Sequence, residues 1–145
     1  MKKALILIVM VVFSLVAVSA SFAKPGKCPQ PRKTKTAPGS IAKKDKTAKA
    51  NAKNGKAIYM KKAKPMACKM CHGKKGDGGG KLGAVLKPAP RNFTCKATMK
   101  KVSAGQMFHI IKNGSKGTGM VGHKKTLKDK EIWDVVKYIR STFVK

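Results

Sequence analysis

Two of the four cysteines in this chain lie three positions apart and are followed at once by a histidine, in the segment Cys68-Lys-Met-Cys71-His72-Gly73. The chain has 145 residues and only three histidines, so this grouping of scarce residue types needs an explanation. Two thiols and an imidazole within five residues can converge on one common partner. Such a partner would tie this segment down and restrict how the rest of the chain can fold.

The spacing indicates covalently bound haem. The thiols of Cys68 and Cys71 can add across the two vinyl groups of one haem, and His72 is then aimed at the iron from the same side. Zinc is an alternative, but it needs four ligands. No second paired spacing occurs among the remaining candidates, which are Cys28, Cys95, His109 and His123. A redox-active thiol pair is another alternative, but such a pair normally follows a buried strand, and residues 65–67 do not form a strand pattern.

The N-terminal 23 residues have the pattern of a signal peptide. Lys2 and Lys3 precede an uncharged run over residues 4–18, and Ser21-Phe22-Ala23 has the small-x-small form of a cleavage site. An uncleaved membrane anchor over residues 4–23 is the alternative, because about 20 apolar residues suffice to span a bilayer. Both interpretations place residues 24–145 outside the cytoplasm, in the periplasm, where thiols are oxidised unless something holds them.

The charge of the chain selects anionic partners. The formal net charge is +29, and without Lys2 and Lys3 the chain keeps 32 Lys and Arg against 5 Asp and Glu, which is +27. Nucleic acid is not expected, because an exported protein seldom meets it and no aromatic residues alternate with the lysines to form a stacking surface. We expect acidic proteins as partners, with peripheral contact to an anionic membrane surface as a further possibility.

The composition changes once, near residue 53. Residues 24–52 consist mainly of Lys, Ala, Pro, Thr and Gly, with Ile41 as their only branched aliphatic residue and no aromatic residue. Such a segment buries too little apolar surface to offset its ordering entropy, so we expect a disordered basic arm. Residues 53–145 form the single folded domain.

Three helices are expected in this domain, and no strand. The first covers Ala52 to Ala63. The second starts at Ser103, with Gln106 as its capping-box partner, and stops at Asn113-Gly114. The third runs from Asp129 to Phe143 with one apolar stripe, formed by Ile132, Val135, Val136, Ile139 and Phe143. Three short helices bury too little for a rigid core, so we expect an all-α fold packed around the haem.

A haem iron held by one histidine has a sixth position to fill. The candidate ligands are Met99, Met107, His109, Met120 and His123. Met120 is favoured, because it lies in a loop whose glycines let the backbone approach a flat cofactor closely. His123, three residues later, and an iron without a second protein ligand are the alternatives.

These residues resemble a known family. From Asn54 to Phe143 the chain resembles a class I c-type cytochrome of the small bacterial monohaem kind, and it is similar to the cytochrome c domains of oxidase-associated haem subunits. The segments that carry the resemblance are Asn54-Gly-Lys-Ala-Ile-Tyr59, Cys68-x-x-Cys71-His72-Gly73, Gly76-Asp-Gly-Gly, Leu86-Lys-Pro-Ala-Pro-Arg-Asn-Phe-Thr94, Ile110-Ile-Lys-Asn-Gly114 and Leu127-Lys-Asp-Lys-Glu-Ile-Trp-Asp-Val-Val-Lys-Tyr-Ile-Arg140.

The resemblance implies a set of haem contacts. Cys68 and Cys71 would carry the thioether links, His72 and Met120 would be the axial ligands, and the Pro88 carbonyl would fix the histidine ring. Gly55 and Tyr59 would meet the third helix, near Trp133, Tyr138 and Ile139. The chain departs from the family pattern in two places: Lys128 replaces a helix-capping serine, and the Met120 loop lacks the proline that often follows the ligand.

The implied function is electron transfer without catalysis. We expect an exported, monomeric one-electron carrier with one haem c, which docks on acidic redox proteins through lysines around the haem edge. These lysines are Lys69, Lys74, Lys75, Lys116 and Lys124. A fixed haem module of a larger respiratory complex is one alternative, and a haem enzyme or sensor with an open sixth site is another.

Cys28 and Cys95 remain after the haem has taken its two thiols. In an oxidising compartment such residues are often paired, and a bond between them would pin the arm to the domain. The alternative is two independent thiols, with Cys95 buried as a small apolar residue.

Overall fold

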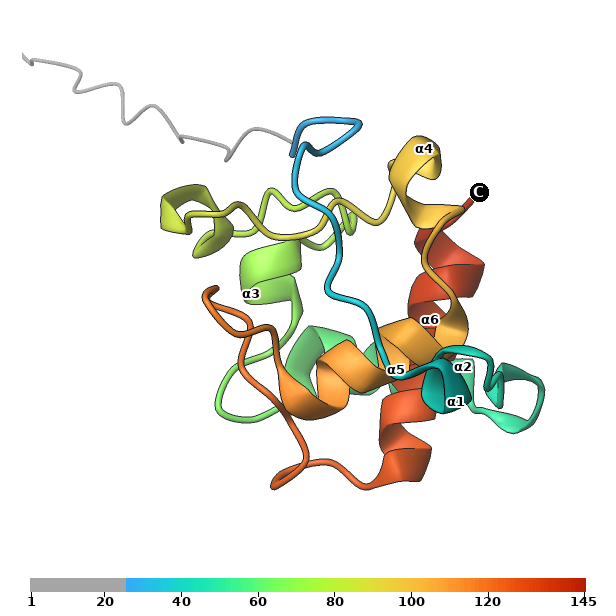
Figure 1. Cartoon of the computed structure of the whole chain (residues 1–145). Helices are drawn as coiled ribbons and strands as arrows, with labels where there is room; N and C mark the ends of the chain where they lie inside the picture. The colour runs from blue at the N-terminus through green and yellow to red at the C-terminus, as the bar shows by residue number, and fades with distance from the viewer. Residues whose placement is uncertain (1–25) are drawn as a thin grey trace, which may run out of the picture.

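The computed structural model describes residues 26–145 (Figure 1), so the expected leader over residues 1–23 lies outside the described part. The described residues form helices and loops without a strand, which confirms the all-α prediction. The elements in order are α1 (Gly39–Ala42), η1 (Thr47–Lys49), α2 (Ala52–Ala57), η2 (Ile58–Lys62), α3 (Lys69–His72), η3 (Gly83–Val85), α4 (Lys96–Met99), α5 (Ala104–Asn113) and α6 (Asp129–Phe143). Within residues 26–145, every helix is too short or too polar to span a bilayer.

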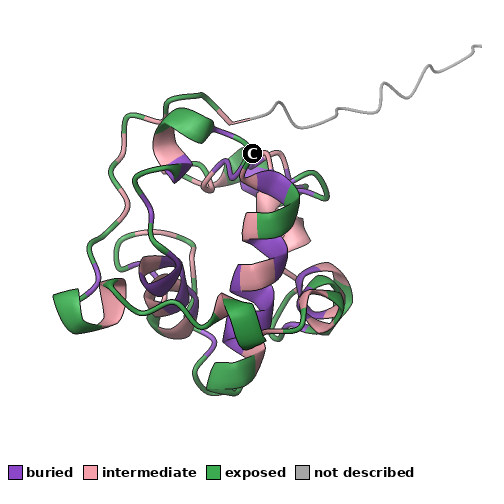
Figure 2. Ribbon diagram, turned by 90° about the vertical axis from the view of Figure 1, so that its right-hand side faces the viewer, coloured by how far each residue is buried: buried purple, intermediate pink, exposed green. Residues whose placement is uncertain are grey.

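The C-terminal helix α6 is the centre of the fold, and buried residues recur along most of its length (Figure 2). The segment α2–η2 packs against one side of it at Gly55, where any Cβ would clash with the Asp134 carbonyl. The Tyr59 ring lies 5.4 Å from that of Tyr138. The predicted contact of Gly55 and Tyr59 with the C-terminal helix is thus confirmed. Trp133, also predicted near this contact, faces α5 instead and stacks on Phe108 at 4.5 Å.

The three predicted helices are present, and their ends explain two details of the sequence. The Ser103 hydroxyl accepts the Gln106 backbone N–H at 3.1 Å, as expected of an N-cap. The Gln106 side chain does not complete the capping box, because its amide donates to the Lys35 carbonyl at 3.0 Å instead. At α6 the Glu131 carboxylate accepts the Lys128 backbone N–H at 2.8 Å, so the helix start is capped without a serine.

The basic arm differs from the prediction of disorder. Residues 26–51 follow a defined path across the domain, and α1 packs beside α5 (Figure 1). There the Ser103 hydroxyl donates to the Ala42 carbonyl at 2.6 Å, and Gly105 leaves room for the Ile41 carbonyl. The low apolar content of this segment limits only what its side chains can bury. Hydrogen bonds to its backbone hold it in place, and composition does not reveal them.

A disulfide joins Cys28 to Cys95, with their Cα atoms 5.4 Å apart and a sequence separation of 67. The hypothesis of a pair is therefore confirmed over that of two independent thiols. Two hydrogen bonds reinforce the anchor: the Gly26 N–H donates to the Asp77 carbonyl at 2.7 Å, and the Asn92 amide donates to the Gly26 carbonyl at 2.8 Å. The start of the arm is thus fastened to the loops before α4.

Candidate functional site

The paired cysteines lie on one turn of helix, α3, with Cys68 as its N-terminal flanking residue. Residues three apart on a helix share a face, so the two thiols can reach the same partner. Gly73 ends this turn at φ 80°, a backbone conformation that glycine adopts without strain. The buried Tyr59 hydroxyl donates to the Gly73 carbonyl at 2.8 Å. The attachment segment is therefore held against η2.

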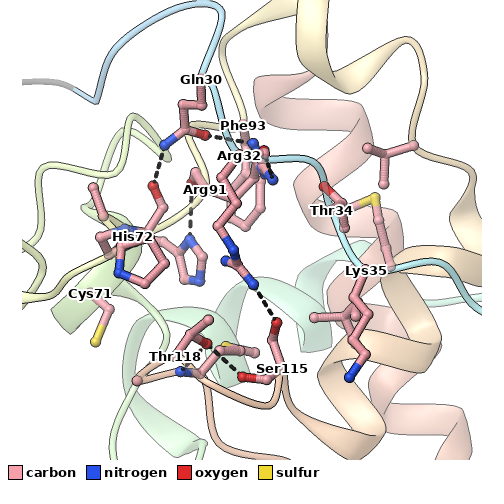
Figure 3. Close-up of a pocket in the computed structure, with 18 of the residues that line it drawn as sticks. Gln30, Arg32, Thr34, Lys35, Cys71, His72, Arg91, Phe93, Ser115 and Thr118 are labelled. Atoms are coloured by element: carbon pink, nitrogen blue, oxygen red, sulfur yellow. Dashed lines mark hydrogen bonds between the residues drawn. The ribbon is translucent and has the colours of Figure 1, made fainter.

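The imidazole of His72 is oriented by two neighbours. Its Nδ1 lies 3.0 Å from the Arg91 carbonyl (Figure 3), and its ring stacks on Phe93 at 4.5 Å. A carbonyl can only accept, so Nδ1 carries the proton and Nε2 keeps a lone pair for a metal. The predicted role of the Pro88 carbonyl is therefore wrong, because the carbonyl that faces the ring is that of Arg91, three residues later.

Burial sets the protonation of these groups. Burial raises the pKa of the Cys68 thiol to about 11 and also raises the pKa of Cys71. Burial likewise lowers the pKa of His72, which favours its neutral ring, although the Arg91 hydrogen bond opposes this. Redox-active thiol pairs have lowered values instead, so the thiol-redox alternative loses support. Within residues 26–145 no three His, Cys, Asp or Glu side chains gather as a metal site, which leaves the zinc alternative without ligands.

Cys71 and His72 line a partly open cavity of about 130 Å³. Much of the wall is apolar, formed on the α4, α5 and α6 side by Met99, Val102, Met107, Ile110, Ile111 and Ile139. Pro88, predicted as a cofactor contact, also lines the cavity. Cys68, the other predicted thioether residue, does not line this cavity. An apolar wall beside the Cys71 thiol and an imidazole with a free nitrogen suits a covalently attached haem.

Of the five candidate sixth ligands, the methionines line the cavity and the histidines do not. Met99, Met107 and Met120 line it, whereas His109 and His123 do not. The ring of His123 is buried elsewhere, with Nδ1 2.9 Å from the Lys64 carbonyl. The structure thus brings the predicted residues Cys71, His72 and Met120 to one cavity.

The loop around Met120 is braced by its own hydrogen bonds. The Met120 N–H donates to the Thr118 hydroxyl at 3.1 Å, and the Met120 carbonyl accepts the Ser115 N–H at 2.9 Å. The Thr118 hydroxyl in turn donates to the Ser115 carbonyl at 2.7 Å. These bonds fix the backbone from which the Met120 side chain extends.

Sequence reasoning missed the contribution of the arm. Four arm residues line the cavity together with α3 and the later loops (Figure 3); they are Gln30, Arg32, Thr34 and Lys35. It also missed Arg91 and Phe93, which position His72. One signal was available in the composition: the chain has only three arginines among its 34 basic residues, and Arg32 and Arg91 are two of them.

Comparison with known proteins agrees with this geometry. The family described as Cytochrome c matches residues 52–143. A chain of the reducing HAO-like protein complex of Kuenenia stuttgartiensis is similar in structure, with 27% sequence identity and a TM-score of 0.53. The similarity covers 63% of this chain and 43% of that one, so this chain spans less than half of its length. No curated protein matches. The chain belongs to the cytochrome c family, and its cytochrome c domain implies an electron-transfer protein with covalently bound haem c.

Proposed function

We propose that this protein is an exported one-electron carrier with a single haem c, whose iron is bound by His72 and Met120. The observation that carries the proposal is the bond between His72 Nδ1 and the Arg91 carbonyl, which leaves Nε2 as the metal-binding nitrogen. The sequence contains one Cys-x-x-Cys-His segment, and this is the basis for proposing one haem. Cys68 and Cys71 would hold the haem through thioether links.

The axial pair determines the chemistry. A haem iron bound by histidine and methionine exchanges single electrons and has no free position for a substrate, and the thioether favours its ferrous state. The protein's part is to hold both ligands in place. Phe93 and Arg91 fix the ring of His72, and the Ser115–Thr118 hydrogen bonds fix the backbone of Met120.

The surface beside the attachment segment suits an acidic redox partner. Lys74 and Lys75, directly after it, are exposed, and so are Lys116 and Lys124 in the Met120 region. Among residues 26–145 the only ion pairs join Lys112 to Asp129 and Lys130 to Asp134, so no carboxylate of the described chain neutralises these lysines. Such a positive field steers acidic proteins into contact.

An exposed apolar centre accompanies these charges. In η3, which packs against α3, Val85 is 79% exposed, and the preceding Leu82 is 37% exposed. A small apolar patch with a charged rim is the usual composition of a transient protein interface. We therefore place the docking surface on α3, η3 and the lysines that follow α3.

A spectroscopic comparison tests the ligand assignment. Met120→Ala should abolish the methionine-to-iron charge-transfer band of the ferric protein and let the ferrous protein bind carbon monoxide. Met99→Leu and Met107→Leu are matched controls, because both side chains line the same cavity, and they should keep the band. Loss of the band in either control instead, or carbon monoxide binding by the unmodified protein, would contradict the assignment and favour a haem enzyme or sensor.

A kinetic comparison tests the docking surface. Electron transfer to an acidic partner protein should slow steeply as salt is added, because exposed charges are screened over about 8–10 Å at moderate ionic strength. Reversing the charges of Lys74 and Lys75 to Glu should reduce both the rate and its salt dependence. The same change at Lys43 and Lys44, an exposed pair beside α1, should have little effect. Equal effects of the two pairs would show that only the total charge matters.

Export is the remaining part of the proposal. The signal pattern over residues 1–23 and the Cys28–Cys95 disulfide both suit an oxidising compartment such as the periplasm. The N-terminal sequence of the protein purified from its own cells should begin near Lys24. A start at Met1, with the protein retained in membranes after a salt wash, would favour the uncleaved anchor.

A fixed haem module of a larger assembly is the second candidate, and the similarity to a chain of the HAO-like protein complex favours it. The two candidates differ in native size. A carrier should leave gently lysed cells as a free monomer, whereas a module should co-elute with a larger haem-containing assembly even at high salt.

A further inference from the structure

Two guanidinium groups line the cavity without an acidic partner. Arg91 donates to the Arg32 carbonyl at 2.9 Å and to the Gln30 side-chain oxygen at 3.0 Å. Arg32 donates to the Ser115 hydroxyl at 3.0 Å. All three acceptors are neutral, and neither ion pair found within residues 26–145 includes an arginine. Burial, reinforced by the charge of Arg32, lowers the pKa of Arg91, which reflects two like charges held close together in a poorly solvated place.

A hydroxyl in the same wall also has no partner. The Thr34 side-chain oxygen is the one buried side-chain N or O atom within residues 26–145 that forms no hydrogen bond. Thr34 follows Arg32 and precedes Lys35 in the sequence, and all three residues line the cavity (Figure 3). A buried hydroxyl without a protein partner is costly, so it usually meets a ligand or an ordered water.

These features describe a binding site for a carboxylate that enters with the cofactor. We propose that the arm binds the propionate groups of the haem, with Arg32, Thr34 and Lys35 from the arm acting together with Arg91. Guanidinium groups bind carboxylates through paired hydrogen bonds, and the propionates are the negative groups that a haem brings to an apolar cavity. The three arm residues lie outside residues 52–143, which match the family. The arm thus contributes three of the four proposed residues from outside the part of the chain that matches the family.

The path of the arm supports this role. Gln30 fixes it just before Arg32, because its amide donates to the Pro90 carbonyl at 2.8 Å and its oxygen accepts the Asn92 N–H at 3.0 Å. Beyond Thr34, the Gln106 amide holds the Lys35 carbonyl at 3.0 Å. The segment between these two anchors is thus held against the cavity. The inference depends on the haem and not on the carrier role or the ligation by Met120.

A pair of adjacent substitutions tests the proposal. Arg32→Gln and Lys33→Gln each remove one positive charge from the arm, but Lys33 is exposed and does not line the cavity. Loss of a charge bound to a propionate favours the ferric state, so Arg32→Gln should raise the ferric-to-ferrous ratio at a fixed potential about tenfold, which is 59 mV for one electron. It should also shift the propionate bands in the resonance Raman spectrum. Lys33→Gln should leave both readouts nearly unchanged, and equal changes in the two variants would overturn the proposal.

Two further variants separate binding from anchoring. Ser115→Ala removes the hydrogen-bond partner of Arg32 within the protein and should leave the propionate bands in place. If it reproduces the effect of Arg32→Gln, Arg32 acts only by anchoring the arm, and the proposal is wrong. Thr34→Val decides the question even if Arg32→Gln yields no holoprotein. If the hydroxyl binds a propionate, Thr34→Val should lower the midpoint of thermal unfolding of the holoprotein. If the hydroxyl has no ligand, its removal should raise this midpoint, and that result would refute the site.

Discussion

The disulfide between the arm and the domain can be removed with little other disturbance. Cys28 is exposed, so Cys28→Ala costs almost no packing, whereas Cys95, only 2% exposed, keeps its buried place. The bond spans 67 residues, and a loop of this length restricts the unfolded chain by about 4 kcal/mol in the chain-entropy model. We expect Cys28→Ala to lose most of this amount, a large part of the roughly 5–15 kcal/mol that stabilises a typical domain.

The loss can be measured on the holoprotein by urea unfolding. Trp133 is the only tryptophan of the chain, and its stacking on Phe108 makes its fluorescence sensitive to the packing of α5 on α6. The control is Lys27→Ala, an exposed neighbour of Cys28, which leaves the bond intact. The denaturant slope should rise in Cys28→Ala, because its unfolded chain is no longer held compact.

Proteolysis gives a second readout of the same change. The arm has many lysines, at which trypsin cleaves, and in the structure its path is held by hydrogen bonds over residues 26–42. Without the bond these contacts should open more often, so trypsin should cut the arm of Cys28→Ala sooner than the rest of the domain. A loss below about 1 kcal/mol, together with unchanged cleavage, would refute the reasoning and show that the hydrogen bonds alone order the arm.

Four further substitutions test the attachment segment and the packing of α2 on α6. Cys68→Ala or Cys71→Ala should yield little holoprotein on a haem-stained gel, because each thioether helps to hold the cofactor, and a stable haem-free double variant would contradict this. Tyr59→Phe removes one of the two donors to the Gly73 carbonyl, which keeps only the Gly76 N–H, and should lower the free energy of unfolding by about 1 kcal/mol. Tyr138→Phe, whose hydroxyl bonds no group within residues 26–145, is the control. Asp134→Ala removes the fully buried carboxylate that accepts the Asn51 N–H and the Asn54 amide, and should cost about 2–4 kcal/mol by urea unfolding, with Asp129→Ala as an exposed control.

Local patterns were sufficient to predict the helices and the attachment segment. The bounds of α6 agree with its apolar stripe, because one face of a surface helix must meet the core. Ser103 was recognised because a cap acts within three residues of itself. Cys68, Cys71 and His72 could be proposed as haem residues for the same reason, since the pattern that they form is confined to five adjacent residues.

The partner of His72 could not be predicted in this way. Pro88 and Arg91 lie in the same loop, and both have a carbonyl that could face the ring. Which carbonyl does so depends on how the loop turns, and the loop is held by contacts with Gln30, 61 and 62 residues away in the sequence. No spacing rule includes such partners, so the error of three residues reflects a non-local cause.

The same cause explains why composition misjudged the arm. A low content of apolar residues shows only that a segment cannot fold by burying its own side chains. This arm instead contributes backbone, amide and guanidinium groups to a domain that already has a core, with sequence separations that include 59 and 83 residues. One side of the cavity then consists of a segment that could not fold by itself. Because Arg32 and Arg91 repel each other there without a carboxylate between them, the order of the arm and the binding of an acidic cofactor should depend on each other.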